Sequence, residues 1–421
     1  MIKENEYAKR RAKLAKQLDS NSLALIFSAD YKIRSNDTEY PFRQNSNFYY
    51  LTGFKEDHSC LVILKKRKKY KTILFVEKKD KAKELWTGQR LGAQAAREKF
   101  DVDEVYEIQE LTQKVNFFEG LVDNFYYNLK DIRVEVLKKE FSKIKIFKDL
   151  SILIEKMRLI KSRNEINLIK KALEITKEAH LHAMRSAKEL HYEYELQAAI
   201  EYVFKKNGAY SDAYTSIVAC ANSANTLHYI SNDKELKNKE LILIDAGCEY
   251  EYYASDITRT IPVDGKFTKA QKEVYEMVLD VQLKILTLIK PGVLRTELQK
   301  EAVKLLTKGM INLGILKKSL KTCIKKELYK KYYPHGIGHW MGIDVHDQCP
   351  YKTKKGKEIP LKPGMVLTIE PGIYLDENDK NVPKKYRGIG IRIEDDILIT
   401  QEGYENLSQD IAKTIQEIES I

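Results

Sequence analysis

The chain has 421 residues, of which 43% are hydrophobic and 32% charged, with 9 prolines and 19 glycines. This length exceeds one ordinary hydrophobic core, and the composition excludes long disordered stretches. The formal net charge is +12, but the lysines are spread along the whole chain, so we interpret them as a solvated surface and predict no nucleic-acid partner. No stretch approaches the roughly 18 uncharged apolar residues of a membrane helix, and the charged N-terminus lacks a signal-peptide core. We therefore expect a cytoplasmic protein without a membrane partner.

The first 155 residues predict a small mixed α/β domain. A helix at the N-terminus precedes an apolar strand, SLALIFSA (22–29), and LVIL and TILFVE then predict a strand pair joined by the lysine-rich turn KKRKKYK (65–71). Amphipathic patterns predict helices over 80–98 and about 107–120. No part of this region carries chemistry that stands alone.

A second domain is predicted over residues 156–421. Ser162 and Glu165 have capping-box spacing, and long helices are expected from there to about Gly208. Apolar strands bearing carboxylates then alternate with helices over 269–289 and 294–313. The five cysteines of the chain form no CxxC pair, which is typical of reduced thiols in a reducing compartment.

Three of the eight histidines fall within PHGIGHWMGIDVHD (334–347), at His335, His339 and His346. The first two have the i, i+4 spacing of a zinc-protease helix, but Pro334 precedes them and two glycines separate them, which disfavours a helix. The segment is therefore predicted to be a loop or a strand end, and its histidines must find partners elsewhere in the chain.

Four carboxylates stand in or at the ends of apolar strands, where an unpaired charge is costly. Asp245 ends one strand, Asp256 is predicted in the middle of another, and Glu370 closes a third. In RGIGIRIEDDILIT (387–400) the isoleucines alternate, so the intervening residues as far as Glu394 are predicted to share the opposite face of one strand.

These acids together predict a metal centre. For a single acid a turn or cap role is the simpler interpretation, but four buried acids repel one another unless cations lie among them. Oxygen ligands with one imidazole, that of His339, suit Mn²⁺, or Co²⁺, Fe²⁺ and Zn²⁺ by substitution. Four carboxylates balance two divalent ions, which would share bridging carboxylates and hold a hydroxide between them.

The segments LIDAGCEYEYYASDITRTIPVDGKF, HGIGHWMGIDVHD, GMVLTIEPGIY and YRGIGIRIEDDILIT resemble the motifs of the pita-bread metallopeptidases, and among these the aminopeptidase P family. EYPFRQNSNFYYLTGF (39–54) and ELWTGQRLG (84–92) resemble the N-terminal domain of the same enzymes. The resemblance implies an α/β (α+β) fold, with a pita-bread catalytic domain over 156–421 and a smaller mixed α/β domain over 1–155. It also implies a manganese-activated Xaa-Pro aminopeptidase, which acts on peptides with proline in the second position.

The same resemblance implies roles for individual residues. Asp245 would chelate one ion, and His339 and Glu370 would complete the other. Asp256 and Glu394 would bridge both ions. Glu370 would also transfer the proton. With Glu370, His335 and His346 are the implied catalytic residues, which line the proline side of the site and the scissile carbonyl, with His346 at the oxyanion. Tyr374 and Arg392 would lie around the proline ring and its carbonyl, and His228 would be a further pocket histidine. His58, His180, His182 and His191 lie outside these motifs and are expected to be structural.

Positions that resemble Trp86 and Asp37 reach the active site of a neighbouring subunit in this family. The resemblance therefore implies a homo-oligomer, a dimer or a tetramer, in which residues 1–155 serve oligomerisation and substrate gating. Several alternatives stay open. A prolidase, which cleaves only dipeptides, would have the same ligands, and a methionine aminopeptidase would not need the N-terminal domain. Creatinase shares the fold without a metal, and a catalytically inactive binding module would usually lose ligands.

Overall fold

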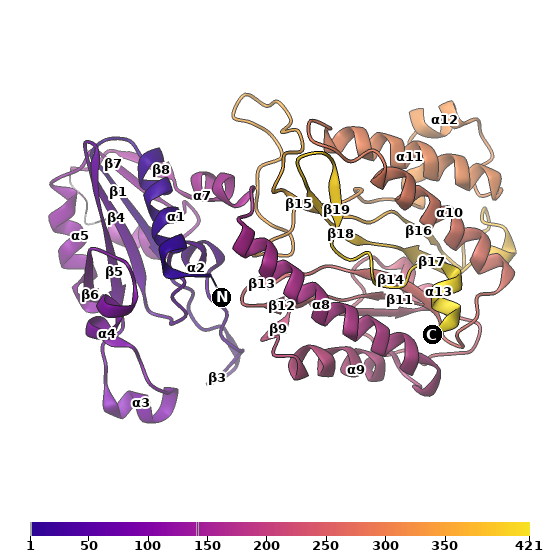
Figure 1. Ribbon diagram of the computed structural model, residues 1–421, viewed down its shortest axis with the longest axis horizontal. Coiled ribbons are helices and arrows are strands. Elements are labelled where there is room, and N and C mark those ends of the chain that lie inside the picture. Colours follow the sequence, from indigo (N-terminus) through magenta and orange to yellow (C-terminus); the bar gives the residue numbers. More distant parts are fainter. Residues whose placement is uncertain (1, 140, 142) are drawn as a thin grey trace. The chain divides into compact units, whose positions relative to one another are not determined.

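The computed structural model describes residues 2–139, 141 and 143–421, and the chain forms two compact units, Met1–Met157 and Arg158–Ile421 (Figure 1). Each unit has its own sheets and its own hydrophobic core. Among the described residues, none of the helices has the length and apolar character that a membrane span needs.

The first unit is built on a six-stranded mixed sheet with the strand order β6-β5-β4-β1-β7-β8. The pairs β1–β4 and β4–β5 are antiparallel, and β6, β7 and β8 join in parallel. The strands are β1 (Ser22–Phe27), β2 (Ile33–Ser35), β3 (Thr38–Glu39), β4 (Cys60–Lys66), β5 (Lys69–Val76), β6 (Glu104–Glu107), β7 (Asn124–Tyr127) and β8 (Ile146–Asp149). The helices are α1 (Glu4–Gln17), α2 (Ser46–Thr52), α3 (Lys81–Thr87), α4 (Gly92–Lys99), α5 (Leu111–Glu119), α6 (Ile132–Lys138) and α7 (Ser151–Arg158).

The predicted elements of this unit are largely confirmed. The strand after the first helix is β1, and the lysine-rich segment is the turn of the β4–β5 hairpin, which closes with the pair Lys66 and Lys69. The single helix predicted over 80–98 is wrong. It is divided into α3 and α4 because Gly88 ends α3 with a φ of 85°, a conformation that a glycine adopts without strain.

The second unit has two halves, each with a pair of helices over its own strands (Figure 1). In the first half α8 contacts β12 and β13 while α9 contacts β9 and β10, and in the second half α10 contacts α11, β15 and β17. The helices are α8 (Arg163–Ser186), α9 (Glu193–Lys206), α10 (Lys269–Leu286), α11 (Arg295–Asn312), α12 (Leu320–Lys325) and α13 (Ile415–Ser420). The predicted capping box is confirmed, because Ser162 and Glu165 exchange side-chain and backbone hydrogen bonds at the start of α8.

The strands of the second unit form small sheets, in the orders β10-β11-β14, β13-β12-β9, β15-β18-β19 and β16-β17. The chain leaves one sheet and enters another at several points. The strands are β9 (Ser211–Asp212), β10 (Ile217–Cys220), β11 (Leu241–Asp245), β12 (Cys248–Tyr250), β13 (Tyr253–Ala254), β14 (Thr258–Pro262), β15 (Val366–Ile369), β16 (Gly372–Leu375), β17 (Ile389–Arg392), β18 (Asp395–Ile399) and β19 (Tyr404–Asn406).

These changes of sheet correct two predictions. Asp256 is not in the middle of a strand, because it lies between β13 and β14, where its N–H donates to the carboxylate of Asp396 instead of to a neighbouring strand. The single strand predicted over 387–400 is broken before Glu394, since β17 pairs with β16 whereas β18 pairs with β15. Glu370 likewise lies between β15 and β16. Three of the four predicted acidic ligands therefore stand at breaks between strands, which turns their side chains away from a regular ladder.

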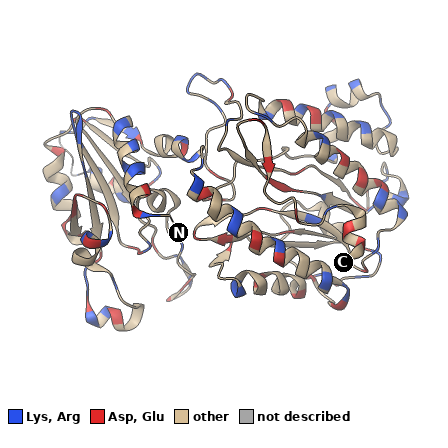
Figure 2. Cartoon of the chain, in the orientation of Figure 1, with Lys and Arg blue, Asp and Glu red and all other residues tan. Residues whose placement is uncertain are grey.

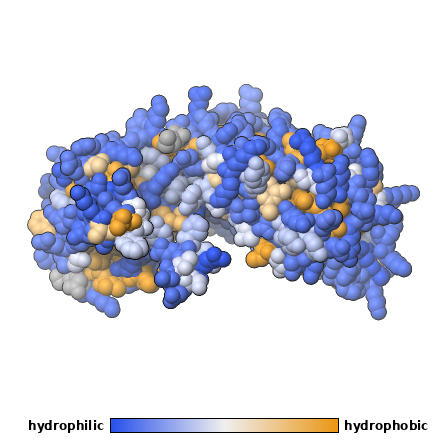
Figure 3. Space-filling model, turned by 90° about the horizontal axis from the view of Figure 1, so that it is seen from below, coloured by the Kyte–Doolittle hydropathy of each residue, from blue (hydrophilic) through white to orange (hydrophobic). Residues whose placement is uncertain are grey.

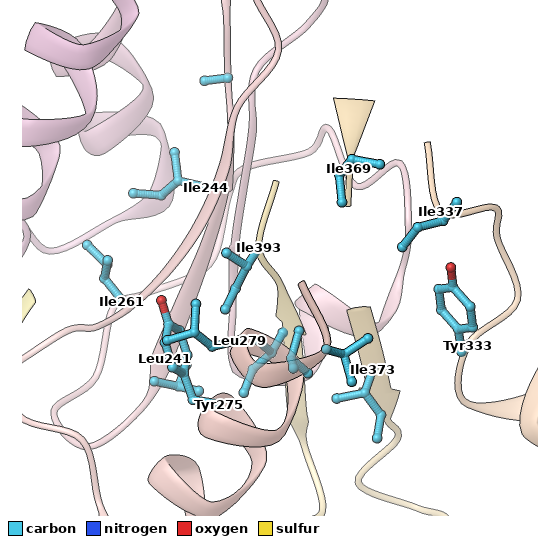
Figure 4. Packing of buried hydrophobic residues seen from close by; sticks show 14 of the residues in the cluster. Leu241, Ile244, Ile261, Tyr275, Leu279, Tyr333, Ile337, Ile369, Ile373 and Ile393 are labelled. Atoms are coloured by element: carbon cyan, nitrogen blue, oxygen red, sulfur yellow. The ribbon is translucent and has the colours of Figure 1, made fainter. Parts of the chain in front are cut away.

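The main hydrophobic core of the second unit lies against these breaks. Tyr275 and Leu279 of α10, Leu241 of β11 and Ile393, next to Glu394, belong to one buried cluster (Figure 4). Burying an isoleucine or leucine side chain contributes roughly 1.5–3 kcal/mol. This packing holds the backbone around the strand breaks in place.

Lysines, arginines and acidic residues are distributed over the helices and loops of both units (Figure 2). The face drawn in Figure 3 is mostly hydrophilic, with separate small apolar patches. All five cysteines are free, in agreement with their scattered spacing, and all five are buried.

Candidate metal centre

A cavity of about 390 Å³ in the second unit collects most of the predicted site residues. All the predicted ligands line it, namely Asp245, Asp256, His339, Glu370 and Glu394. Four of the predicted substrate-side residues line it as well, namely His228, His335, His346 and Arg392. The lining residues run from Tyr214 to Glu394, so the two halves of the unit bring segments that are 180 positions apart in the sequence (394 − 214) to one cavity.

The imidazole of His339 stands among the acids. One ligand atom each of Asp256, His339 and Glu394 lies within 4.8 Å of the other two. His339 Nε2 is 3.3 Å from Asp256 Oδ2 and 3.8 Å from Glu370 Oε1. Acids from three different strand breaks therefore meet around one ring nitrogen.

Backbone contacts fix the orientation of His339. Its Nδ1 lies 3.1 Å from the carbonyl oxygen of Trp340, which accepts a hydrogen bond when Nδ1 carries the proton. That arrangement directs Nε2 towards Asp256. The backbone of His339 pairs with Thr368 of β15, and this approach requires Gly338, because a Cβ there would lie 1.8 Å from the carbonyl oxygen of Thr368.

Tyr214 is part of the site, although it was not predicted from the sequence. Its hydroxyl oxygen lies 2.6 Å from Asp245 Oδ1 and 2.6 Å from Asp256 Oδ1. The hydroxyl has one proton, so it donates to one of these carboxylates at a time, and the other needs a different positive partner. Tyr214 stands among 26 tyrosines in the chain, and its surroundings, SDAYTSIV, follow no recognisable pattern.

Arg392 connects the acids to the predicted substrate side. Its Nη2 donates to Asp245 Oδ2 at 2.5 Å, its Nη1 to the hydroxyl of Tyr374 at 2.9 Å, and its Nε to Thr258 Oγ1 at 3.0 Å. Thr258 in turn donates to Glu394 Oε2 at 2.6 Å. The guanidinium therefore orients two of the predicted ligand carboxylates in addition to any contact with a substrate.

Burial dominates the electrostatics of these acids. It raises the pKa of Glu370 to about 7, with His339 and Arg392 opposing the rise and the neighbouring acids adding to it. Burial also raises the pKa of Asp245, and that of Glu394 more strongly. For His339 burial alone would lower the pKa, but the hydrogen bond to Asp256 and the nearby acids raise it to about 9. A nearby cation stabilises the ionised form of such buried carboxylates most strongly.

The residues present fit divalent metal ions. The donors are carboxylate oxygens and one imidazole nitrogen, a combination that suits Mn²⁺ and related ions. Metal ligands must be deprotonated, so an ion among these acids would take the place of the protons that burial favours. The hydroxyl shared between Asp245 and Asp256 leaves one of their oxygens in need of positive charge.

The predicted substrate-side histidines His335 and His346 differ in the contacts that hold their rings. His335 Nδ1 lies 2.8 Å from the carbonyl oxygen of Gly336, and its Nε2 lies 2.8 Å from the hydroxyl of Tyr374. Burial, and then Arg392, lowers the pKa of His335 to about 4, so this ring is neutral at pH 7. His346 is exposed and its ring packs edge-on against His339 at 4.2 Å between centroids.

The other predicted contacts are placed as follows. His228 is an exposed residue of the cavity lining. Tyr374 is buried, and it reaches the cavity through its hydrogen bonds to His335 and Arg392. Trp86 and Asp37 belong to the first unit. Trp86 is 86% exposed on α3, and Asp37 is exposed in the turn between β2 and β3.

The cavity also has an apolar wall that was not predicted from the sequence. This wall consists of Ile217, Leu227, Ile230 and Val345. Ile230 is 58% exposed, which is unusual for an isoleucine, but exposure cannot be read from a sequence. The wall gives the polar site an apolar side against which a substrate side chain would pack.

Residues 167–401 match the model of metallopeptidase family M24, and residues 7–121 match that of the aminopeptidase P N-terminal domain. The chain therefore belongs to metallopeptidase family M24, as its motifs predicted. The predicted fold, a pita-bread catalytic domain with a smaller mixed α/β N-terminal domain, is confirmed by the same matches and by the solved structures described next.

The similarity to individual proteins extends over the full length. The chain is 40% identical to the Xaa-Pro aminopeptidase of Haemophilus influenzae, over 100% of this chain and 97% of the relative. It is also 40% identical to the Xaa-Pro aminopeptidase of Escherichia coli strain K12, over 100% and 98%. A solved structure of a variant of Escherichia coli aminopeptidase P in complex with substrate matches with a TM-score of 0.96 at 39% identity, over 100% of this chain and 98% of that chain.

Proposed function

We propose that this chain is a metal-dependent Xaa-Pro aminopeptidase, which releases the first residue from peptides with proline in the second position. The observation that carries the proposal is the full-length similarity to enzymes named Xaa-Pro aminopeptidase, in a chain whose cavity is lined by every acid and imidazole of the expected ligand set. A prolidase would use the same ligands, but the names of these relatives favour the aminopeptidase. An inactive binding module is disfavoured because no ligand position is lost.

Two divalent ions, Mn²⁺ in preference to others, belong to this proposal. The residues that would hold them are Asp245, Asp256, His339, Glu370 and Glu394. When bound, such ions supply Lewis-acid chemistry, which makes water acidic and polarises a carbonyl group. The oxygen-rich donor set supports Mn²⁺, and the structure of a Zn-substituted Escherichia coli aminopeptidase P in complex with product is among the solved relatives.

The residues of the cavity divide the remaining tasks. Hydrolysis joins the water oxygen to the carbonyl carbon of the first residue and breaks the bond from that carbon to the proline nitrogen. A proton must therefore leave the water and reach this nitrogen. Glu370 makes the transfer through its carboxylate, and a ring N–H of His346 donates a hydrogen bond to the oxyanion that develops on the carbonyl oxygen.

Recognition of proline is assigned to a second group of residues at the same cavity. The nitrogen of proline is tertiary in the peptide, so it offers no N–H to an acceptor. The site instead presents a surface for the ring, made by His335 and Tyr374, with His228 nearby and Arg392 directed at the peptide carbonyl. The hydrogen bonds that link His335, Tyr374 and Arg392 support this role because they hold the three side chains as one rigid group.

The proposal extends to the whole protein. Residues 156–421 act as the catalytic domain. Residues 1–155 mediate a homo-oligomer, a dimer or a tetramer, in which Trp86 and Asp37 gate the site of a neighbouring subunit. The protein works in the cytoplasm on peptides, with no nucleic-acid or membrane partner. The five free cysteines support a reducing compartment, and the exposure of Trp86 supports an interface.

Peptide hydrolysis tests the substrate class. We expect release of the first residue from an Xaa-Pro-Yaa tripeptide and almost none from Xaa-Ala-Yaa. Similar kcat/KM values for the two would contradict the proline pocket, and cleavage of Xaa-Pro dipeptides alone would identify a prolidase.

Metal removal tests the cofactor. Dialysis against a chelator should abolish activity, and Mn²⁺ should restore it best. Asp256→Asn should lose at least one ion by elemental analysis, whereas Asp264→Asn, an acid outside the cavity lining, should keep both. Full activity of the metal-free protein would exclude the proposed cofactor.

A further inference from the structure

Asp347, the residue after His346, belongs to a buried cluster of charged side chains. None of these side chains lines the cavity. The side chains of Arg158, Lys161 and Asp347 are 2%, 1% and 1% exposed. Lys161 Nζ lies 3.0 Å from Asp347 Oδ2, and the guanidinium of Arg158 donates to Asp347 Oδ1 and, at 2.5 Å, to Asp344 Oδ2. Asp347 therefore receives a cation on each of its oxygens.

The cluster is tied to the frame of the second unit. The backbone N–H of Lys161 donates to the carbonyl oxygen of Gly364, and the N–H of Gly364 donates to that of Ile399, the last residue of β18. The segment 334–347 also packs closely against the cluster at Gly342. A Cβ at Gly342 would lie 2.7 Å from Asp347 Oδ2 and 2.8 Å from Lys161 Cε. The carboxylate of Asp347 is consequently fixed by charge and by packing.

Few contacts hold the side chain of His346. It is exposed, and in the described part of the chain no hydrogen bond to its ring is found. Its edge-on packing against His339 does not by itself fix the direction of its ring nitrogens. The next residue, Asp347, is buried, while His346 lines the cavity, so a buried carboxylate and a cavity-lining imidazole stand on consecutive residues of the segment. The place of His346 therefore depends on its backbone. That backbone is held by the hydrogen bond from the N–H of Asp347 to the carbonyl oxygen of Trp340, at 2.8 Å, and by the contacts of the Asp347 carboxylate with Arg158 and Lys161.

Stability alone does not account for such a cluster. Buried ion pairs contribute little compared with apolar residues of similar volume, because removing the charges from water offsets their attraction. The cluster instead defines the position of the Asp347 carboxylate, because Arg158 and Lys161 each contact one of its two oxygens. Asp347 directly follows His346, the side chain to which the proposed function assigns the oxyanion.

We propose that Asp347, held by Arg158 and Lys161, is a positioning residue that directs His346 at the reacting carbonyl. The proposal rests on the Xaa-Pro aminopeptidase function, in which His346 stabilises the oxyanion. An interaction made only in the transition state affects kcat and leaves KM nearly constant. Loss of the anchor should have the same signature.

The test combines Asp347→Asn with His346→Ala in a double-mutant cycle. Asp347→Asn keeps the shape of the side chain and removes its charge. We expect kcat on an Xaa-Pro-Yaa tripeptide to fall at least tenfold, with KM within twofold and the metal content unchanged. In the His346→Ala background the same substitution should change kcat less than twofold. Equal losses in both backgrounds, or an unchanged kcat in the single variant, would overturn the proposal.

A second variant protects the test against misfolding. Asp347→Asn leaves two buried cations with one carboxylate, whereas Lys161→Met combined with Asp347→Asn removes one charge of each sign. This pair should fold, as its melting temperature will show, and should reproduce both the kcat loss and its dependence on His346. Glu273→Gln is the control, because Glu273 holds Lys385 and Tyr386 outside the cavity lining, and kcat should stay within twofold. A wild-type protein that leaves the tripeptide intact would refute the proposed function, whereas an active wild type with equal losses in both backgrounds would refute the positioning role alone.

Discussion

Single side chains in the second unit are held by partners far away in the sequence, and His180 is an example. It is completely buried in α8, and its Nε2 lies 3.0 Å from the carbonyl oxygen of Ala246, the residue after Asp245. Burial lowers the pKa of His180 to about 4. Since the neutral ring donates through Nε2, this histidine supports the backbone beside a predicted ligand, which agrees with a structural role.

We expect His180 to make the stability of the second unit depend on pH. An unfolded histidine binds a proton near pH 6.5, whereas the folded one does so only near pH 4. Between these values the unfolded state holds more protons, so the free energy of unfolding falls as the pH is lowered from 6.5 to 4, by up to about 3 kcal/mol. His180→Gln retains a donor for Ala246 and should lose this dependence in urea unfolding of the metal-free protein at pH 4.5 and pH 7.

The comparison needs a histidine that is only half-buried. His182→Gln removes such a residue from the same helix, and its variant should behave as the wild type does. If wild type and His180→Gln lose the same free energy between pH 7 and pH 4.5, the buried histidine is not the cause.

At the scale of elements, the identity of the predicted ligands was easier to predict than their geometry. The alternation of Ile389, Ile391 and Ile393 continues across the break between β17 and β18, because both sides of the break bury their isoleucines in the same core. Periodicity reports burial and not which strand is the partner. The strand break at Glu394 and the one at Asp256 therefore became visible only with the sheet pairing.

Two glycines in the histidine segment should respond differently to the same substitution. A Cβ at Gly338 would meet the carbonyl oxygen of Thr368 at 1.8 Å, whereas at Gly336 the nearest atom, on Arg295, is 3.6 Å away. Gly338→Ala should therefore displace His339 from β15, destabilise the fold by roughly 1–3 kcal/mol and weaken metal binding. Gly336→Ala is the matched control and should bind metal as the wild type does. Calorimetric titration with Mn²⁺ measures the difference, and equal affinities in the two variants would contradict the close approach to β15.

For the whole molecule, the sequence was sufficient to predict the fold class and the family, because the family motifs are contiguous and specific. It was not sufficient for the contacts that support them. Tyr214 lies 31 residues from Asp245, and Arg158 lies 189 residues from Asp347, so neither pair forms a local pattern. Such pairs depend on tertiary packing, which brings Tyr214 to Asp245 within the first half of the second unit and Arg158 to Asp347 across the length of that unit. The proposed gating role of the first unit involves a neighbouring subunit, which the sequence of one chain does not describe.

The proposed assembly gives Trp86 a measurable role. Trp86 and Leu85 are 86% and 84% exposed on α3, where no residue is buried, and in the proposed assembly the neighbouring subunit would cover this apolar pair. We expect Trp86→Ala to keep the fold and both metal ions while it lowers kcat/KM on longer peptides by roughly tenfold, since a tryptophan at the centre of an interface often contributes 2 kcal/mol or more. Kinetics on peptides measures the change in kcat/KM, and light scattering measures the mass of the assembly.

Fluorescence provides an independent measurement, because the chain has two tryptophans and Trp340 is 1% exposed. The emission of Trp340 should stay constant on dilution, so a red shift as the oligomer dissociates would come from Trp86 alone and should be absent in Trp86→Ala. Phe117→Ala removes another exposed aromatic residue of the first unit, 67% exposed on α5, and should change neither mass nor activity. A fully active monomer, with Trp86→Ala indistinguishable from wild type, would refute the gating role, because the catalytic unit would then need no neighbouring subunit.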